Sequence, residues 1–396
     1  MAEIKLIAEI ADNQIRYIIC EQDDKAECKI LNKKISDNNA IVRGKVNDFD
    51  LASKKIDQDI KALEKESGKN FNNISLIINE PDIFCTNISG FKKLNGSKVE
   101  KRDLDYILNE AKSSIAKNQE KNSILHILNS NFILDKNKQD KIPLDLHGDQ
   151  LGLHMTFISL PTNNLKNIRS LFDINDLTVD RVISKPFAHG INLILKKENL
   201  NNSVVINFDK ELSNISLYEE NSLIFLKTFN FGTNSIYRDI NQLCSLKEHE
   251  IKRIIREIDL SLINSEKSRY IDEKFFTDSH YKKLSTKHLN EIINSRVNEM
   301  INYIFNKNKN LDYINGKIIT IFLIFEDENI FESLKRFFIQ NFHMDKQKTQ
   351  IKSSVLNKFS ALSGASELIF KGWPKEAIPF NHRKKSLISS FFERFF

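Results

Sequence analysis

The residues whose types and spacing most clearly suggest a chemical activity stand at the end of this sequence. A cationic cluster, Arg383, Lys384 and Lys385, precedes the segment 386–396. Written as a helix, this segment places one set of side chains on a single apolar face: Leu387, Ile388, Phe391, Phe392, Phe395 and Phe396. Arg394 lies on the opposite, polar face. An apolar face behind a run of cations is typical of a short helix that lies in an anionic membrane surface. The pattern equally fits a terminal helix that docks on the protein's own core.

A second pair of residues has a spacing that suits binding. Arg296 and Glu299 stand three residues apart on a predicted helix, 286–306. A guanidinium can hold a carboxylate through two parallel hydrogen bonds, so Arg296 could receive an acidic peptide. A surface ion pair between these two residues, worth under about 1 kcal/mol, explains the same spacing. Both interpretations remain open on the sequence alone.

Other kinds of site are not indicated. The three histidines His126, His147 and His154 fall on different predicted elements without the spacing of zinc ligands. The four cysteines are scattered, which favours a reducing compartment and no metal. We find no nucleophile–histidine–carboxylate arrangement. The sequence therefore predicts no metal site and no catalytic residue.

Composition narrows the class of protein. A hydrophobic content of 40%, a charged content of 28% and a length of 396 residues are those of a folded chain with room for two domains. The net charge of +6 is mild and shows no basic stripe with interleaved aromatic residues, so we expect no nucleic-acid partner. The first residues lack the pattern of a secretory signal, and no window of about 20 apolar residues occurs. We expect a cytoplasmic protein.

The predicted elements fall into two similar series. Strands at 4–10, 15–20 and 29–35, a helix at 51–63 and a strand at 74–78 open an α/β lobe. A second series begins with strands at 204–208, 215–218 and 223–229 and ends with a strand at 318–325 and helices at 329–342 and 355–370. Between the two series, 84–160 reads as an inserted α+β unit of one helix and three strands. This order indicates a duplicated α/β fold.

Several motifs point to a known family. The segments 124–135 (ILHILNSNFILD) and 144–154 (LDLHGDQLGLH) resemble a paired motif of the bacterial cell-division proteins FtsA, with Asn129 and Phe132 in place of a proline and a tyrosine. The segments 163–167, 231–240 and 295–300 resemble later motifs of that family in the same order. The sequence thus resembles the FtsA family of the actin-like superfamily over nearly its whole length. The resemblance implies a two-lobed actin-like (ribonuclease H-like, duplicated) α/β fold with an inserted subdomain.

The resemblance also places the boundaries of the domains. It implies a first lobe of 1–83 and 161–195, interrupted by the inserted subdomain at 84–160. A second lobe at 196–371 would contain a partner-docking subdomain at 246–314. A basic linker, 372–385, and the membrane-targeting helix, 386–396, complete the chain.

The sequence departs from the family where a nucleotide would bind. Actin-like ATPases hold ATP and magnesium with glycine-bearing turns of the form DIGT and DIGGGT. Here the corresponding segments are 9–12 (EIAD) and 207–212 (NFDKEL), and 324–327 replaces the adenosine-side TGG. The degenerate nucleotide residues implied by the resemblance are Glu9, Ala11, Asp12, Asn207, Asp209 and Gly232. Because side chains block the close approach of backbone to phosphate that glycine allows, we expect no ATP hydrolysis and no bound cofactor.

The resemblance implies three partners. Arg296 and Glu299 would capture the C-terminal tail of the tubulin-like protein FtsZ, the terminal helix would bind an anionic membrane, and copies of the chain would form a homo-polymer or homo-oligomer. We therefore predict a cell-division adaptor, peripheral on the inner face of the plasma membrane at the division site. An active actin-like ATPase and an actin-like binding module of pilus or secretion assembly remain the alternatives. A lipid anchor of its own would distinguish this chain from the second alternative.

Overall fold

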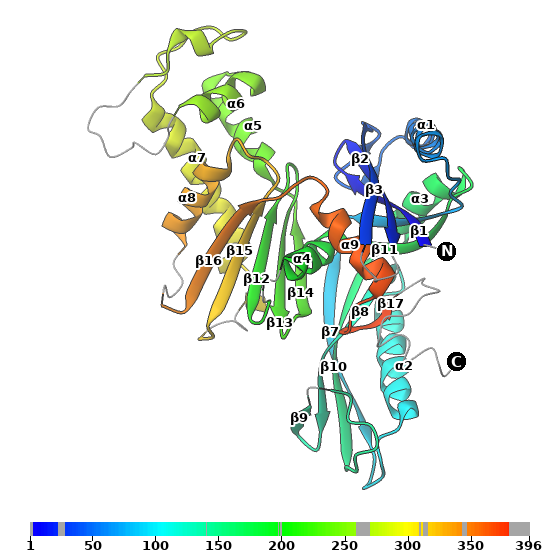
Figure 1. Cartoon of the computed structure of the whole chain (residues 1–396). Helices are drawn as coiled ribbons and strands as arrows, with labels where there is room; N and C mark the ends of the chain where they lie inside the picture. The colour runs from blue at the N-terminus through cyan, green and yellow to red at the C-terminus, as the bar shows by residue number, and fades with distance from the viewer. Residues whose placement is uncertain are drawn as a thin grey trace. The chain divides into compact units, whose positions relative to one another are not determined.

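The computed structural model describes residues 3–22, 28–139, 141–196, 198, 200–258, 270–308, 310–311, 316–342 and 347–379. These residues form two compact units (Figure 1). Unit 1 contains the described residues of 1–203, 216–228 and 359–379, and unit 2 contains those of 204–215 and 229–358. Both units combine strands with helices, and the predicted α/β class is confirmed.

Unit 1 begins with a five-stranded sheet in the order β11-β6-β1-β2-β3. β1 (Glu3–Ala11), β2 (Gln14–Gln22) and β3 (Cys28–Asp37) form an antiparallel meander, and β6 (Asn73–Ile78) and β11 (Thr178–Ser184) run parallel to β1. β1 and β6 are apolar runs buried on both faces, as strands inside a covered sheet are. β3 lies at the edge of the sheet and alternates exposed with partly buried residues.

Helices cover both faces of this sheet. They are α1 (Phe49–Ser67), α3 (Thr162–Asp173), α4 (Lys185–Leu195) and α9 (Ser360–Lys371). The Tyr17 hydroxyl lies 3.5 Å from Asp59 of α1, whereas Glu9, in register with Arg16, contacts Lys185 at the start of α4. Because successive side chains of a strand point to opposite faces, α1 and α4 cover opposite faces of the sheet. α9 packs on α4.

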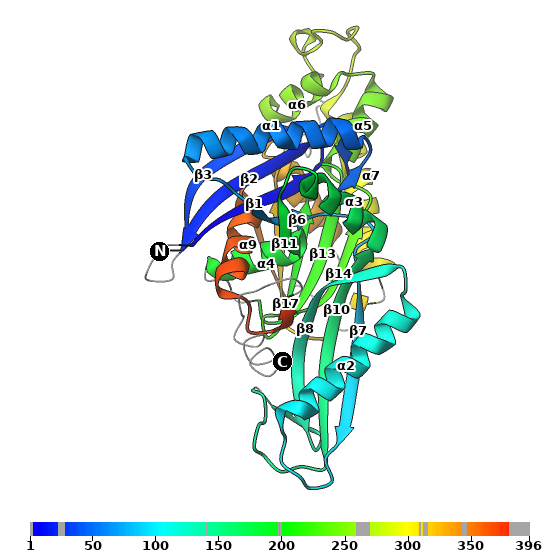
Figure 2. The same cartoon turned by 90° about the vertical axis from the view of Figure 1, so that its right-hand side faces the viewer.

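The predicted insertion forms antiparallel strands with one helix packed on them. Its elements are β7 (Phe84–Lys93), α2 (Lys101–Asn118), β8 (Asn122–Leu134), β9 (Asn137–Gln139) and β10 (Gln150–Pro161). Within unit 1 these strands lie between β14 (Ser222–Phe229) and β17 (Glu376–Pro379), in the order β14-β7-β10-β8-β17, and β9 pairs with β8. α2 places Leu104, Ile107 and Leu108 on this sheet at helical spacing. At the start of the helix, the Glu100 backbone N–H donates a hydrogen bond to the Asp103 carboxylate, which caps the helix. Figure 2 shows α2 crossing the strands of this sheet, where it packs on β7 and β10.

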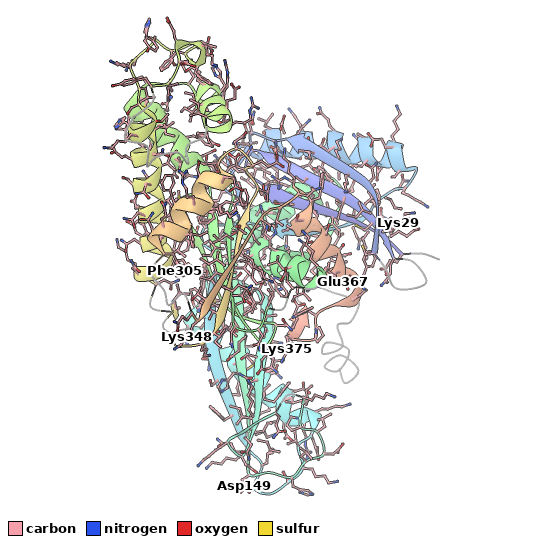
Figure 3. All side chains as sticks on the ribbon, turned by 60° about the vertical axis from the view of Figure 1, so that its left-hand side comes forward. Lys29, Asp149, Phe305, Lys348, Glu367 and Lys375 are labelled. Carbon is pink, nitrogen blue, oxygen red and sulfur yellow. The ribbon has the colours of Figure 1, made fainter. Side chains whose placement is uncertain are left out.

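The end of the described chain differs from the prediction. The helix expected at 355–370 in the second lobe is α9, which belongs to unit 1. Residues 376–379, expected in the linker 372–385, form β17 (Glu376–Pro379), which pairs antiparallel with β8. The physical reason is long-range pairing: β17 has only four residues and ends at a proline, so its local pattern resembles a linker. Lys375, at the start of this segment, is labelled in Figure 3.

Unit 2 combines strands and helices in a second α/β arrangement. Its elements are β12 (Ser203–Phe208), the first part of β13 (Ser213–Glu219), α5 (Thr233–Cys244), α6 (Glu248–Glu257), α7 (Thr286–Ile301), β15 (Ile319–Phe325), α8 (Phe331–Asn341) and β16 (Thr349–Val355). β15 and β16 are parallel neighbours, and the order continues to β12. β14 (Ser222–Phe229), predicted in the second lobe, lies almost wholly in unit 1. None of the described helices has both the length and the apolar character that crossing a bilayer requires.

Candidate functional site

The turn between β1 and β2 contains the first predicted nucleotide segment. Ala11 ends β1, and Asp12 and Asn13 form the turn, with Asn13 at a φ of 54°. The Asp12 carboxylate accepts a hydrogen bond from the Arg43 backbone N–H at 2.8 Å, and the Asn13 N–H donates to the Ile41 carbonyl at 3.0 Å. The turn is therefore tied to the loop that carries Arg43. An approaching phosphate would meet the like charge of Asp12 there.

Glu9 stands where the family's turn carries an aspartate near magnesium. Its side chain is 0% exposed. One carboxylate oxygen lies 3.0 Å from Lys185 Nζ and 3.4 Å from an Arg16 guanidinium nitrogen. Two cations therefore neutralise this buried carboxylate and join β1 to the start of α4. These two ion pairs fix the position of α4, and they reduce the negative charge that Glu9 could offer to a divalent cation.

The second predicted segment follows β12 in unit 2. The Asp209 N–H donates to the Leu212 carbonyl at 3.0 Å, which closes a tight turn. The Asn207 side-chain amide donates to the Asp209 carboxylate at 2.9 Å, and both side chains are buried. This turn carries side chains at the positions where the family has consecutive glycines. Within the turn, the side chains of Asn207 and Asp209 bond to each other.

The first turn of α5 completes this site. The N–H groups of Thr233 and Asn234 donate to the carbonyls of Asp209 and Lys210, each at 2.9 Å. Helix N-termini commonly bind anions through these N–H groups. A Cβ on Gly232 would lie 2.4 Å from both carbonyl oxygens, so the approach of the two segments requires glycine.

A carboxylate of the chain itself lies beside this helix start. Glu211 accepts a hydrogen bond from the Asn234 side chain at 2.8 Å and two from Arg238, each at 3.0 Å. Glu211 and Arg238 also line a pocket of about 370 Å³. Glu211 thus supplies an internal anion where the first turn of α5 favours negative charge.

The third predicted segment ends at Asp327. Its carboxylate accepts a hydrogen bond from the Tyr237 hydroxyl at 2.9 Å and another from the Asn329 N–H at 3.0 Å. Burial and the neighbouring Asp327 raise the pKa of Tyr237, which keeps the phenol protonated as a donor. The segment therefore joins α5 to the end of β15.

Arg296 has a partner that sequence reasoning missed. Its guanidinium binds Asp239 of α5 through two hydrogen bonds of 2.5 and 2.8 Å and also binds Glu299 at 2.5 Å. The hydrogen bond with Asp239 raises the pKa of Arg296. Asp239 lies 57 positions earlier, so the spacing along α7 gave no signal for it. Arg296 connects α7 to α5, and an incoming carboxylate would compete with two resident ones.

A buried polar cluster in unit 1 was also missed. His126, Arg181 and Glu376 come from β8, β11 and β17 and are at most 1% exposed. The Glu376 carboxylate accepts a hydrogen bond from His126 Nδ1 at 2.9 Å and another from the Arg181 guanidinium at 2.5 Å. The Ser184 backbone N–H donates to His126 Nε2 at 3.1 Å, so this imidazole is neutral with its proton on Nδ1.

Charge within this cluster is balanced. Burial opposes ionisation of Glu376, but the charge of Arg181 and the hydrogen bonds from His126 and Arg181 together outweigh it and lower the pKa of Glu376. Burial also lowers the pKa of His126. Glu376 is thus a buried carboxylate paired with Arg181, and it fixes β17 to the body of unit 1.

The remaining predicted residues are not brought together. His147 is exposed and hydrogen-bonds the Gly96 carbonyl at 2.9 Å, whereas His126 is buried on β8. The predicted membrane-binding residues all lie outside the described residues: Arg383, Lys384, Lys385, Leu387, Ile388, Phe391, Phe392, Arg394, Phe395 and Phe396.

Comparison with known proteins agrees with this architecture. Residues 81–159 match the family model of the SHS2 domain inserted in FtsA. The cell division protein FtsA of Buchnera aphidicola subsp. Schizaphis graminum is 23% identical over 246 residues, which cover 62% of this chain and 58% of the relative. FtsA of Agrobacterium fabrum is 26% identical over 217 residues, which cover 53% and 47%. The chain thus spans about half the length of the curated relatives it matches.

A solved structure extends the likeness to the whole fold. A chain of the PilM–PilN type IV pilus biogenesis complex superposes with a TM-score of 0.57 and 11% identity, covering 92% of this chain and 98% of that one. The fold is that of the actin-like ATPases. Through the match to the inserted SHS2 domain and through these sequence relatives, the chain is similar to the FtsA proteins.

Proposed function

We propose that this chain is a cell-division adaptor that tethers FtsZ filaments to the cytoplasmic face of the plasma membrane. The observation that carries the proposal is the FtsA-type insertion at 81–159 within an actin-like fold. The relatives reported above are named cell division protein FtsA, which supports a role in cell division. The amphipathic pattern of 386–396 supports the lipid contact.

The adaptor would act through multivalency. A single short amphipathic helix binds lipid weakly and reversibly. Copies of the chain that associate side by side would present many such helices at once, and linked weak contacts produce a strong combined attachment. Self-association is therefore part of the proposal.

Nucleotide chemistry is not part of this mechanism. Glu9 is held by two cations, and the first N–H groups of α5 bond to the chain's own carbonyls. Glu211 supplies an internal carboxylate on Arg238. These residues do not fit a bound triphosphate, so we propose an adaptor that works without ATP.

The lipid anchor is tested by sedimentation with vesicles of anionic phospholipid. The full chain should pellet with them, and a chain lacking 383–396 should stay in the supernatant with an unchanged melting temperature. Two matched variants separate the helix faces: Phe392→Asp should abolish pelleting, whereas Ser390→Asp, with the same added charge on the opposite face, should retain it. Equal pelleting of the full and shortened chains would contradict the anchor.

Docking of the FtsZ tail is tested by fluorescence anisotropy of a labelled tail peptide. If Arg296 grips the peptide directly, Arg296→Ala should weaken binding about tenfold or more, and Asp239→Ala should not, because it frees the guanidinium. A loss of equal size in both variants would mean that the α5–α7 ion pair only supports the docking surface. Unchanged binding in both variants would remove Arg296 from the proposal.

A further inference from the structure

Two cysteines of unit 1 project to the same face of the five-stranded sheet. Three successive pairs join the end of β2 to the start of β3: Gln22 with Cys28, Glu21 with Lys29, and Cys20 with Ile30. All three pairs lie on one side of the register shift in this ladder. Because opposed residues share a face, as do alternate residues of one strand, Cys20 and Cys28 are diagonal neighbours on that face.

Helix α9 covers this face. Arg16 of β2 bonds Glu9 on the face of α4, and Cys20, four positions later in the same strand, projects to the same side. α9 packs on α4 and also contacts β2 and β3. Cys20 is 0% exposed, whereas Cys28, at the start of the edge strand, is partly exposed. One thiol is therefore accessible to solvent, and the other is enclosed beside it.

The two thiols are hydrogen-bonded to each other. Cys20 donates to the Cys28 sulfur, and the Ser366 hydroxyl of α9 donates to the same atom. Both bonds stabilise a negative charge on this sulfur, and the bond from Cys20 is the main cause that lowers the pKa of Cys28 to about 7. The same bond and burial raise the pKa of Cys20, while the charge of Lys33 acts against this rise. The pair therefore combines an ionisable sulfur with a protonated one.

The charged side chains of α9 near Cys28 act in opposite directions. Lys371 favours the thiolate and Glu367 opposes it, and the two are paired with each other at 2.7 Å. Glu367 and Lys29, the residue that follows Cys28, are labelled in Figure 3. Burial also opposes the thiolate, so the hydrogen bonds from Cys20 and Ser366 are what activate Cys28.

We propose that Cys20 and Cys28 are a redox-sensitive modification site, at which hydrogen peroxide oxidises Cys28 and Cys20 then closes a disulfide. The Cys28 thiolate attacks one peroxide oxygen; the S–O bond forms, the O–O bond breaks, and the departing hydroxide takes up the proton that Cys28 released. The Cys20 sulfur then attacks the Cys28 sulfur; the S–S bond forms, the S–O bond breaks, and hydroxide leaves with the Cys20 proton as a second water. Two thiols are thereby oxidised, and one peroxide is reduced to two waters.

The geometry sets the order of the two steps. Cys28 is the accessible and ionisable sulfur, so it reacts first. Its oxidation removes the negative charge that holds the proton on Cys20, and Cys20 then becomes able to release that proton. In a reducing compartment a disulfide of this kind is transient, as redox-sensing disulfides are.

Closing the disulfide draws two strand ends together. Diagonal neighbours on antiparallel strands are about 7–8 Å apart between Cα atoms. Disulfides usually need a Cα separation of at most about 6.8 Å. Cys28 begins β3 and Cys20 lies two residues before the end of β2, so the shift disturbs few bonds of the ladder. A disulfide under such strain is reduced easily by other thiols, which makes the modification reversible.

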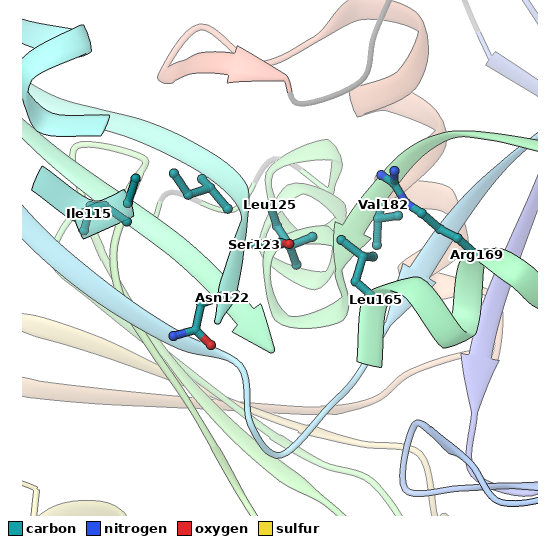
Figure 4. A pocket seen from close by; sticks show the side chains of 9 residues that line it. Ile115, Asn122, Ser123, Leu125, Leu165, Arg169 and Val182 are labelled. Atoms are coloured by element: carbon teal, nitrogen blue, oxygen red, sulfur yellow. The ribbon is translucent and has the colours of Figure 1, made fainter. Parts of the chain in front are cut away.

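No cavity is required for this reaction. The pocket of about 330 Å³ in unit 1 is lined from α2, β8, α3 and β11, as at Ile115, Leu165 and Val182 (Figure 4). None of the described residues that line it is a cysteine. Cys28 lies on the edge strand β3 instead, where a molecule as small as hydrogen peroxide reaches its sulfur from solvent.

Mass spectrometry of the full chain tests the pair, with the other two cysteines as internal controls. Burial raises the pKa of Cys85 to about 11 and also raises the pKa of Cys244. Hydrogen peroxide at pH 7 should therefore join Cys20 to Cys28 at least about tenfold faster than it modifies either control thiol. Dithiothreitol should reverse the change. Equal oxidation of Cys28 and Cys85 would overturn the proposal.

Variants assign the two roles. In Cys20→Ser, Cys28 should accumulate as a sulfenic acid that dimedone captures, whereas the parent chain should give little of this adduct. In Cys28→Ser, Cys20 should stay reduced, and Cys85→Ser should form the disulfide at the parental rate. Equal dimedone capture in the parent chain and in Cys20→Ser would overturn the disulfide. These assays contain neither lipid nor FtsZ, so their failure is distinguishable from failure of the proposed function.

The pH dependence of alkylation tests the activating hydrogen bond. Labelling of Cys28 by iodoacetamide should rise about fivefold from pH 6 to pH 7 and level off above about pH 8, because the rate follows the thiolate fraction. Cys20→Ala removes the donor and should move the midpoint to higher pH, whereas Cys20→Ser retains a hydroxyl donor and should move it less. Both variants are assayed well below their melting temperatures. Identical profiles in all three chains would overturn the activation of Cys28 by Cys20.

Discussion

At the scale of single residues, the segments predicted to correspond to nucleotide-binding turns form hydrogen bonds within the chain itself. Gly232 illustrates this: its lack of a side chain lets α5 approach the Asp209–Lys210 carbonyls. The glycine is therefore explained by packing alone. Glu211 and Asn234 add a further bond between the same two segments.

Substituting Gly232 tests this role. A Cβ would lie 2.4 Å from two carbonyl oxygens, so Gly232→Ala should lower the free energy of unfolding by about 1–3 kcal/mol. Lys210→Ala, an exposed change in the same turn, should stay within about 0.5 kcal/mol of the parent. Urea denaturation measures both. Equal stability of Gly232→Ala and the parent would show that the turn moves freely.

His126 makes stability depend on pH. Burial lowers its pKa in the folded chain below the ordinary value of 6.5, so the unfolded chain takes up a proton first as the pH falls. The free energy of unfolding should therefore fall between pH 7 and pH 5, by up to about 1.4 kcal/mol per pH unit from this residue. His126→Asn should flatten that slope, and His280→Asn, at an exposed position, should retain it. Melting curves across this range measure the slopes, and identical slopes in all three chains would contradict the assignment.

At the scale of elements, the sequence predicts what local periodicity encodes. The apolar spacing of 51–63 and the cap at Gly68 correspond to α1, which ends with Gly68 at a φ of 64°. The insertion was placed at 84–160, and the family model matches 81–159. Elements whose stability comes from distant partners were missed. β17 depends on Arg181, 195 positions from Glu376, and β16 gains its pairing from β15.

In the candidate site, too, local features could be predicted from the sequence and contacts between distant residues could not. The loss of glycine from the nucleotide segments is visible in the sequence, but the new bonds of Glu9 and Glu211 are not, because their partners belong to other elements. Arg296 was expected at a docking surface, and its bidentate partner Asp239 could not be read from the spacing on α7. Ion pairs between elements depend on tertiary placement that one-dimensional patterns do not contain.

The α4–α9 contact shows why the last helix joins unit 1. A Cβ on Gly364 would lie 2.0 Å from the Ala188 carbonyl oxygen, so the two helices approach with their backbones nearly in contact. Small residues at such a position fix which surfaces can meet. The chain order of α9 suggested the second lobe, and packing assigns it to the first unit.

Gly364→Ala tests this contact. In an isolated helix the change would add up to about 1 kcal/mol of stability. Here it should remove about 1–3 kcal/mol, because the new methyl group overlaps the Ala188 carbonyl. Ser363→Ala, at the half-buried position just before Gly364 in α9, should change stability little. Urea denaturation compares the two, and a gain of stability in Gly364→Ala would show that the helices separate easily.

At the scale of the whole molecule, the proposal is an actin-like protein without a nucleotide cycle. A ligand that binds only the folded state stabilises it by about 2.7 kcal/mol at a hundredfold excess over its dissociation constant. We expect the melting temperature in millimolar MgATP to equal the melting temperature in inorganic triphosphate at the same ionic strength. A rise of several degrees specific to MgATP, together with micromolar binding by calorimetry, would restore the ATPase alternative. If no rise occurs, the proposed assembly would need an input other than nucleotide, and the density of lipid-bound copies is one that requires no hydrolysis.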